Sequence, residues 1–186
     1  MNNKIVENRI TLVVIRHGES DANERGIISD KNVDHELTAT GIQQAQETAE
    51  CLKNEQFDLV LTSTRQRARL TAEIVNEYHG VTIIERADLI ERDFGVIGGI
   101  PQSDAQAKME KEGFSWIDIP GSERAEEIDV RVSRVLRFLR ENHANKKILI
   151  STHSDIVKSF HRLINGVPVE ESISIQVNNS EPHYFS

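Results

Sequence analysis

Residues 10–20, with the sequence ITLVVIRHGES, decide the fold and direct the search for a site. The first six are apolar or β-branched, which is typical of a strand that is buried on both faces. A polar cluster, Arg16-His17-Gly18-Glu19-Ser20, follows at once, and Asn23 lies just beyond it. In open sheets built from such strands, ligands bind beyond the carboxyl ends of the strands. The stretch therefore predicts both a central strand and the edge at which function resides.

The same pattern recurs outward along the chain. Short β-branched runs predict further strands at 58–62, 81–85 and 147–152. Amphipathic spacing predicts helices at 38–53, 66–78, 122–142 and 154–164. In the first helix, Ile42, Ala45, Ala49 and Leu52 are expected to face the core, with Cys51 also buried. Residues 173–177 and 183–185, around Asn178-Asn179, predict a hairpin.

Strands that alternate with helices predict an α/β fold, a three-layer α/β/α sandwich around a mostly parallel sheet. No repeat or linker divides the sequence, so we expect a single domain over residues 1–186.

The composition of the chain limits the kinds of molecule that it is expected to bind. A net charge of −8 argues against nucleic acid or an anionic membrane. No apolar run reaches the ~20 residues of a membrane span, and residues 1–9 lack the pattern of a signal peptide. With one cysteine, no internal disulfide can form, and we expect a cytoplasmic protein. The oligomeric state stays open.

Three predicted strands end in polar clusters: Arg16 to Ser20, Ser63 to Arg67, and Thr152 to Asp155. In a parallel sheet the three meet at one edge, gathering two histidines and at least two arginines. Arginine forks match phosphate oxygens, and a helix opening at Ser154 would add backbone donors. Gly18 would let the backbone approach a ligand. The sequence therefore predicts a phosphoryl-binding pocket and, as partner, a small phosphorylated metabolite.

Other site chemistries lack their motifs. No His-Glu-x-x-His or cysteine pair indicates a metal. His17-Gly18-Glu19 resembles the start of a zinc deaminase motif, but one cysteine cannot supply its Pro-Cys-x-x-Cys partner. Nucleotide-binding glycine loops and Gly-x-Ser-x-Gly are absent as well. The remaining histidines and two neighbouring arginines are interpreted as structural or surface residues: His35, His79, His143, His161, His183, Arg65 and Arg69.

Six segments in order resemble the histidine phosphatase superfamily, which includes cofactor-dependent phosphoglycerate mutase. Arg16 to Ser20 resembles its signature. The other segments are similar to its remaining blocks: Leu37 to Ala45, Ser63 to Ala72, Leu89 to Gly95, Gly121 to Glu123, and Ile150 to His153. The resemblance covers nearly the whole chain and implies a phosphoglycerate mutase-like fold with a short cap insertion at about 100–120.

The resemblance also implies roles for the residues. His17 would be the nucleophile, Glu91 the proton donor, and His153 a further catalytic residue. Phosphate oxygens would be bound by five side chains: Arg16, Asn23, Arg67, His153 and Ser154. No metal and no cofactor would be needed, because arginines neutralise the charge. The reaction implied is hydrolysis of a small phosphate monoester through a phosphohistidine.

Several departures bear on the substrate. Ser154 replaces the glycine that usually follows the second histidine, Thr64-Arg65 replaces Pro-Leu, and Asp93-Phe94 stands where mutases carry His-Tyr. The cap holds mixed charge, with Lys108 and Lys111 against four acids. This favours a phosphatase over a phosphoglycerate-type mutase, and a non-catalytic phosphate-binding protein remains a third alternative. Phe114 and Trp116 are either substrate walls or residues that pack the cap onto the body.

Overall fold

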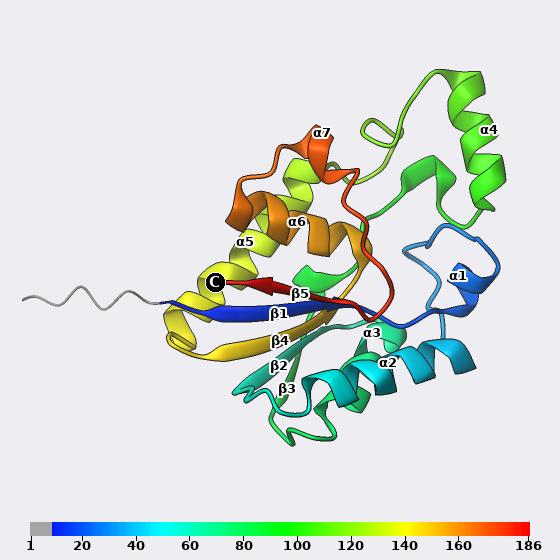
Figure 1. Ribbon diagram of the computed structural model, residues 1–186. Coiled ribbons are helices and arrows are strands. Elements are labelled where there is room, and N and C mark those ends of the chain that lie inside the picture. Colours follow the sequence, from blue (N-terminus) through cyan, green and yellow to red (C-terminus); the bar gives the residue numbers. More distant parts are fainter. Residues whose placement is uncertain (1–8) are drawn as a thin grey trace, which may run out of the picture.

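A computed structural model describes residues 9–186 and contains a five-stranded sheet in the order β3-β2-β4-β1-β5 (Figure 1). The polar start of the chain lies outside the described residues. The strands are β1 (Thr11–Arg16), β2 (Leu59–Ser63), β3 (Ile83–Arg86), β4 (Lys147–Thr152) and β5 (Pro182–Phe185). The first four are parallel, and β5 pairs antiparallel with β1. The predicted mostly parallel sheet is confirmed.

Helices cover both faces of this sheet. The longer helices of the chain are α2 (Ala39–Leu52), α3 (Gln66–Asn76), α4 (Gln102–Glu112), α5 (Ala125–Asn142) and α6 (Ser154–Asn165). The short ones are α1 (Asp21–Glu24) and α7 (Val169–Ser172), with single 3₁₀ turns at Ala87–Leu89 and Gly95–Ile97. One core cluster joins the sheet to α5 and α6, and a second joins it to α2 and α3. The three-layer sandwich predicted from the sequence is confirmed.

The strand β1 shows why the sheet is buried on both sides. Leu12 and Val14 pack into the α5–α6 cluster, while Val13 and Ile15 pack into the α2–α3 cluster. All four side chains are fully buried. Because successive side chains of a strand point to opposite faces, an unbroken apolar run is what a doubly covered strand requires.

The predicted C-terminal hairpin is wrong. Residues 173–177 form no strand, and the strand at Pro182–Phe185 pairs with β1 instead. Ser180 has a left-handed backbone (φ 59°) and donates its backbone N–H to the Arg16 carbonyl. The strand at Pro182–Phe185 therefore forms its hydrogen bonds with β1, which is far away in the sequence, and not with the neighbouring residues 173–177.

The predicted core face of α2 needs two corrections. Ile42 is 37 % exposed, and Cys51 is also exposed. The buried face instead includes Gly41 and Thr48, besides Ala45, Ala49 and Leu52. The Thr48 hydroxyl donates to the Ser180 carbonyl at 2.7 Å, which satisfies its hydrogen-bonding need inside the protein. The buried face of α2 therefore passes through Gly41 and Thr48 and leaves Ile42 at the surface.

Gly18 and Gly41 bring the polar loop after β1 against the start of α2. A Cβ on Gly18 would lie 2.3 Å from the Gly41 carbonyl oxygen, and one on Gly41 would lie 2.0 Å from the Glu19 carbonyl oxygen. The close approach that Gly18 permits is therefore to backbone. The expectation that Gly18 makes room for a ligand is corrected: it makes room for the helix that supports the site.

We expect Gly41→Ala to lower the free energy of unfolding by about 1–3 kcal/mol, the range for overpacking. The clash outweighs the intrinsic helix preference of alanine over glycine, about 1 kcal/mol. Urea unfolding followed by circular dichroism measures the change. The control is Gly98→Ala, where φ is −63° and an added Cβ meets its neighbours no closer than 3.5 Å. Equal stability of the two variants would contradict the packing argument.

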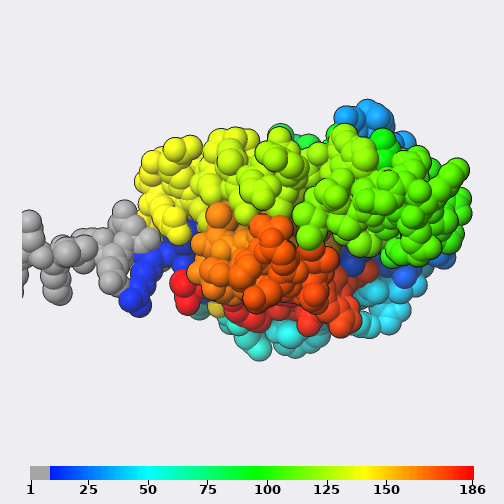
Figure 2. Space-filling view, turned by 90° about the horizontal axis from the view of Figure 1, so that it is seen from above, coloured from blue at the N-terminus to red at the C-terminus, as the bar shows by residue number. Residues whose placement is uncertain are grey.

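The cap is the segment around α4 that follows β3. Ile97, Ala105 and Ile119 form its buried cluster, and Phe114 and Trp116 pack against it. In Figure 2 the cap (green) and the α6–α7 segment (orange) lie next to each other on one face. Within residues 9–186, no helix is long and apolar enough to cross a membrane.

Candidate active site

The predicted clusters meet at the carboxyl ends of β1, β2 and β4, beyond which lies a cavity of about 200 Å³. Most of the predicted site residues line it, together with residues from the cap and the loop after α1. Its lining consists of Arg16, His17, Ser20, Ala22, Asn23, Ile27, Ile28, Ser29, Arg67, Glu91, Phe94, Gln102, Trp116 and Ser154. Among the predicted residues, His153 alone does not line the cavity.

His17 lies at the floor of the cavity, with 3 % of its surface exposed. Its Nδ1 lies 2.6 Å from the Gly18 carbonyl oxygen, which can only accept a hydrogen, so Nδ1 carries the proton. The lone pair then resides on Nε2, which accepts a hydrogen bond from Arg67 Nε at 3.0 Å. Burial, with Arg67 and Arg16 nearby, holds the pKa of His17 well below its ordinary value. The ring is a neutral base whose free atom is Nε2.

Two guanidinium groups, those of Arg67 and Arg16, line the cavity together with His17. Besides His17, Arg67 donates from Nη2 to the Ser29 hydroxyl at 2.9 Å, and Arg16 donates from Nη1 to the Val177 carbonyl at 2.9 Å. Two of their donors, Arg16 Nε and Arg67 Nη1, are buried without a hydrogen-bond partner among residues 9–186. Buried donors are rarely left unpaired. The pair is therefore suited to bind a multivalent oxyanion.

His153 lies beside His17, with ring centroids 5.1 Å apart, but it is completely buried. Its Nδ1 lies 3.3 Å from Arg67 Nη2, and its Nε2 lies 2.9 Å from the Ser63 hydroxyl. Burial and the Arg67 charge hold the pKa of His153 well below its ordinary value, so the ring is neutral. In this arrangement His153 contacts Arg67, and it acts on the cavity through that guanidinium.

Glu91 lines the same cavity as the two arginines. Burial is the largest cause that raises the pKa of its carboxyl, and the neighbouring Asp155 raises it further. Its Oε1 accepts backbone N–H groups from Arg92 at 3.0 Å and Asp155 at 3.3 Å. A carboxyl that is fixed in place and tends to keep its proton is suited to act as a general acid.

Asn23 and Ser154 complete the predicted set. The Asn23 Oδ1 accepts from the backbone N–H and the hydroxyl of Ser20, which caps α1. Its amide nitrogen is therefore the group that can donate into the cavity. Ser154 is the first residue of α6, with His153 as the N-cap. The predicted helix start is confirmed, and it turns the positive end of α6 toward the cavity.

The C-terminal segment supports the site in a way that sequence analysis missed. The Asn179 side chain donates from Nδ2 to the His17 carbonyl at 2.8 Å. Together with the Ser180–Arg16 and Arg16–Val177 bonds, this contact fixes the backbone that carries the nucleophile candidate. No local signal distinguishes Asn179 from an ordinary turn asparagine, because its partner lies 162 positions away.

Trp116 and Phe114 differ in their surroundings. Both pack against the cap cluster, but Trp116 also lines the cavity, whereas Phe114 does not. Contact of Trp116 with a substrate stays a prediction, and Phe114 packs the cap.

The other histidines lie outside the cavity. His35 is buried and bonded through Nδ1 to Asp21 at 2.9 Å, and His161 lies 3.2 Å from His183 between ring nitrogens. No group of three or more histidine, cysteine or acidic side chains within residues 9–186 is arranged to hold a metal.

Comparison with known proteins shows to which family the chain belongs. The model of the histidine phosphatase superfamily (branch 1) matches residues 12–182. The chain is 35 % identical to the "Uncharacterized phosphatase PhoE" of Bacillus subtilis (strain 168) over 153 residues, 82 % of this chain and 76 % of the relative. It is 30 % identical to the 2,3-bisphosphoglycerate-dependent phosphoglycerate mutase of Allorhizobium ampelinum, covering 94 % and 89 % of the two chains.

A solved structure of a mycobacterial glucosyl-3-phosphoglycerate phosphatase in complex with VO3 shares the fold, with a TM-score of 0.83 at 23 % identity. The alignment covers 95 % of this chain and 90 % of that one. With the family model matching most of its length, the chain belongs to the histidine phosphatase superfamily.

Proposed function

We propose that the chain is a metal-independent phosphatase that hydrolyses a small phosphate monoester through a phosphohistidine on His17. One observation carries the proposal: the unprotonated Nε2 of His17 lies at a cavity wall beside two guanidinium groups with unpaired buried donors. Phosphoryl transfer requires a nucleophile and an oxyanion-binding group at the same point, and this observation supports the proposal.

In the first step, Nε2 of His17 attacks phosphorus, a P–N bond forms, and the P–O bond to the alcohol breaks. The departing oxygen takes a proton from the Glu91 carboxyl. In the second step a water molecule attacks phosphorus and gives its proton to the Glu91 carboxylate. The P–N bond breaks, releasing phosphate and restoring both the neutral imidazole and the protonated Glu91.

The cations act on the charge that spreads over the phosphoryl oxygens in the transition state. Arg16 and Arg67 are held at the cavity by protein hydrogen bonds, and Arg67 gives up its bond to Nε2 of His17 when that lone pair attacks phosphorus. Asn23 and the first turn of α6 at Ser154 supply uncharged donors. We assign His153 the task of orienting Arg67, because its ring contacts that guanidinium and is itself fully buried.

The mutase alternative has less support from the cap. Lys108 is paired with Glu112 at 2.8 Å, and Lys31, across from the cap, is paired with Asp93 at 2.7 Å. A second phosphate group would have to compete with these acids. The non-catalytic alternative is disfavoured because a proton donor candidate, Glu91, faces the same cavity as His17.

Hydrolysis of phenyl phosphate in the presence of a metal chelator tests the proposal. We expect release of inorganic phosphate across pH 5–8. Binding of inorganic phosphate without any turnover would instead identify a non-catalytic protein. Formation of 2-phosphoglycerate from 3-phosphoglycerate and 2,3-bisphosphoglycerate, faster than phosphate release, would identify a mutase.

Glu91→Gln separates substrates by their leaving groups. Since phenolate leaves without much help and an alkoxide needs a proton, we expect a loss of about 10²–10⁴-fold in kcat/KM on an alkyl phosphate and a much smaller loss on an aryl phosphate. Steady-state kinetics on butyl phosphate and 4-nitrophenyl phosphate measure both. Asp93→Asn is the control, a nearby acid that is bonded to Lys31. An equal loss on both esters would remove Glu91 from the acid role.

The pH dependence follows from the two pKa shifts. His17 must be unprotonated, and because its pKa lies well below the ordinary value, activity should not fall as pH drops from 7.5 to 6.5. Glu91 must be protonated in the first step, and its pKa is raised, so activity on butyl phosphate should decline as pH rises through that value. The activity of the wild type on butyl phosphate, divided by that of Glu91→Gln at each pH between 4 and 8, isolates the part of the pH dependence that is due to Glu91. A ratio that does not change with pH would contradict the assignment.

A further inference from the structure

Asp34 lies in the loop between α1 and α2, outside the set of residues that line the cavity of the candidate active site. Its Oδ2 accepts the backbone N–H of Gln66, the first residue of α3, at 3.0 Å, and its Oδ1 accepts the backbone N–H of His35 at 3.0 Å. His35 is itself buried and bonded to Asp21. The carboxylate of Asp34 is therefore fixed at the start of the helix that carries Arg67.

This position brings the carboxylate close to Arg67. Oδ1 of Asp34 lies 3.8 Å from Nη1 of Arg67, the donor that has no hydrogen-bond partner among residues 9–186. The distance is too long for a hydrogen bond but short enough for a strong attraction between the two charges. Burial lowers the pKa of Arg67, and the charges of Glu91 and Asp34 act against this effect. Asp34 therefore acts on the guanidinium through its charge.

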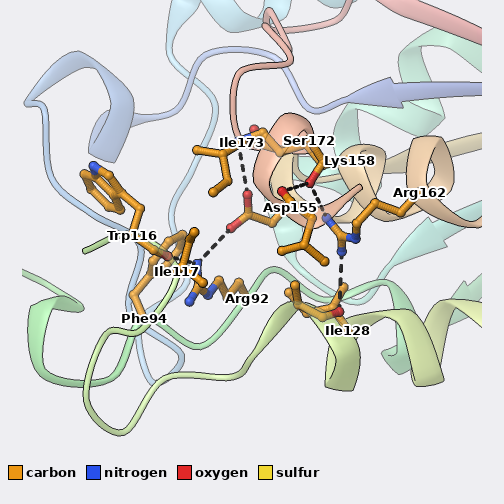
Figure 3. A pocket seen from close by; sticks show the side chains of 13 residues that line it. Arg92, Phe94, Trp116, Ile117, Ile128, Asp155, Lys158, Arg162, Ser172 and Ile173 are labelled. Atoms are coloured by element: carbon orange, nitrogen blue, oxygen red, sulfur yellow. Dashed lines mark hydrogen bonds and ion pairs between the residues drawn. The ribbon is translucent and has the colours of Figure 1, made fainter. Parts of the chain in front are cut away.

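The other acids near the site are placed differently. Burial raises the pKa of Glu91, so its carboxyl tends to keep its proton. The carboxylate of Asp155 lies 4.0 Å from Nη1 of Arg92, and Figure 3 shows this contact beside the neighbouring cavity. Within residues 9–186, Asp34 is the one acid with an oxygen within 4.0 Å of a nitrogen of Arg67. Asp34 is therefore the counter-ion of this arginine.

A counter-ion at this point opposes the binding of phosphate. A phosphoryl group bound at Nη1 of Arg67 brings its negative charge toward Asp34, and like charges repel. Inorganic phosphate, the product of the proposed reaction, would use the same donors as the phosphoryl group of the substrate. Two guanidinium groups without a nearby acid would hold this product more tightly, and its release would be slower.

We propose that Asp34 is a positioning residue whose carboxylate, acting at Arg67, keeps the affinity of the site for phosphate low enough for the product to leave. The proposal rests on the phosphatase function above and assigns the control of product release to one acid. Asp34 takes no part in making or breaking bonds, because it does not line the cavity.

Asp34→Asn removes the charge and keeps an oxygen that can accept the N–H of Gln66. We expect the dissociation constant of inorganic phosphate at pH 7.5 and low ionic strength to fall about 3–10-fold, the size that Coulomb's law gives for a unit charge just beyond the arginine that binds a dianion, in largely aqueous surroundings. Calorimetric titration measures it. KM for phenyl phosphate should fall as well, whereas kcat should not rise, because the added affinity acts on substrate, transition state and product alike.

Salt distinguishes an effect of charge from an effect of shape. The Debye length falls from about 30 Å at 0.01 M salt to about 3 Å at 1 M, so the gain in affinity should shrink to less than about twofold in 1 M sodium chloride. Glu36→Gln is the matched control, because Glu36 is an exposed acid two positions along the same loop. This control should give a clearly smaller gain than Asp34→Asn at low salt. An equal gain would mean that any acid of the loop acts at a distance, and the assignment to Asp34 would fail.

Asp34→Ser is a second neutral variant, with a hydroxyl that can accept the N–H of Gln66 if the asparagine does not fit. Thermal unfolding shows that each variant is folded. Unchanged or weaker phosphate binding in a folded neutral variant would overturn the proposal, since it would leave Asp34 only a structural role at the start of α3.

The binding measurement needs no turnover, so the two proposals can fail separately. Tighter phosphate binding by Asp34→Asn in a protein that hydrolyses no ester would retain the counter-ion and remove the phosphatase. Turnover by the wild type, together with an unchanged phosphate affinity in the variant, would do the reverse.

Discussion

His17→Ala is expected to reduce phosphate release from phenyl phosphate by about 10⁴-fold or more, the scale found when a nucleophile or its base is removed. The other histidine of the site, His153, is not a candidate for this role, because it is completely buried and does not line the cavity. Trapping with radiolabelled substrate at alkaline pH adds a direct readout, since labelled protein should form in the wild type and be absent in the variant.

His143→Ala is the control for this substitution. His143 ends α5 at the opposite end of the sheet, and its ring packs on Phe138. The control should keep full activity, and both proteins should give the circular dichroism spectrum of the wild type. Retention of activity and of labelling in the His17 variant would show that the nucleophile is another residue.

Arg67→Met should lower kcat/KM by about 10²–10³-fold, as for loss of one transition-state donor. The loss of Arg67 should also change the pH dependence of the activity. Arg67 is one of the charges that lower the pKa of His17, so its removal raises that pKa toward the ordinary value. As pH drops, activity should therefore begin to fall at a higher pH in the variant than in the wild type.

Arg69→Met, two residues along the same helix, is the matched control. Arg69 is 46 % exposed at its side chain and faces Glu73 and Glu85 at 3.7 and 3.8 Å. It should leave both the rate and the pH profile unchanged. A common loss in the two variants would mean that positive charge on α3 acts at a distance, and that Arg67 makes no specific contact with phosphate.

The sequence predicted the parts of the fold that depend on local pattern. The run at 12–15 is apolar at every position, which only a strand covered on both faces explains, and the structure buries all four side chains. It also predicted that the clusters around His17, Arg67 and His153 meet, because parallel strands bring their carboxyl ends to one edge, whereas the part given to Glu91 came from the family resemblance.

What the sequence could not provide depends on partners distant along the chain. The β-branched residues at 173–177 fit a strand equally well, but the edge of β1 selects Pro182–Phe185. Asp155 could have been noticed, since it follows His153 by two positions. Its effect on Glu91 requires the distance between α6 and the loop after β3, which no spacing rule gives.

The antiparallel pairing of β5 with β1 ties catalysis to the rim of the sheet. Edge elements open in local fluctuations more readily than central ones, and here the outermost strand is continuous with the segment that bonds to the Arg16 and His17 carbonyls. Fraying of the last few residues would free these two carbonyls and uncover Phe185, while the four parallel strands kept their pairing. The proposed nucleophile can therefore lose the support of its backbone while most of the sheet persists.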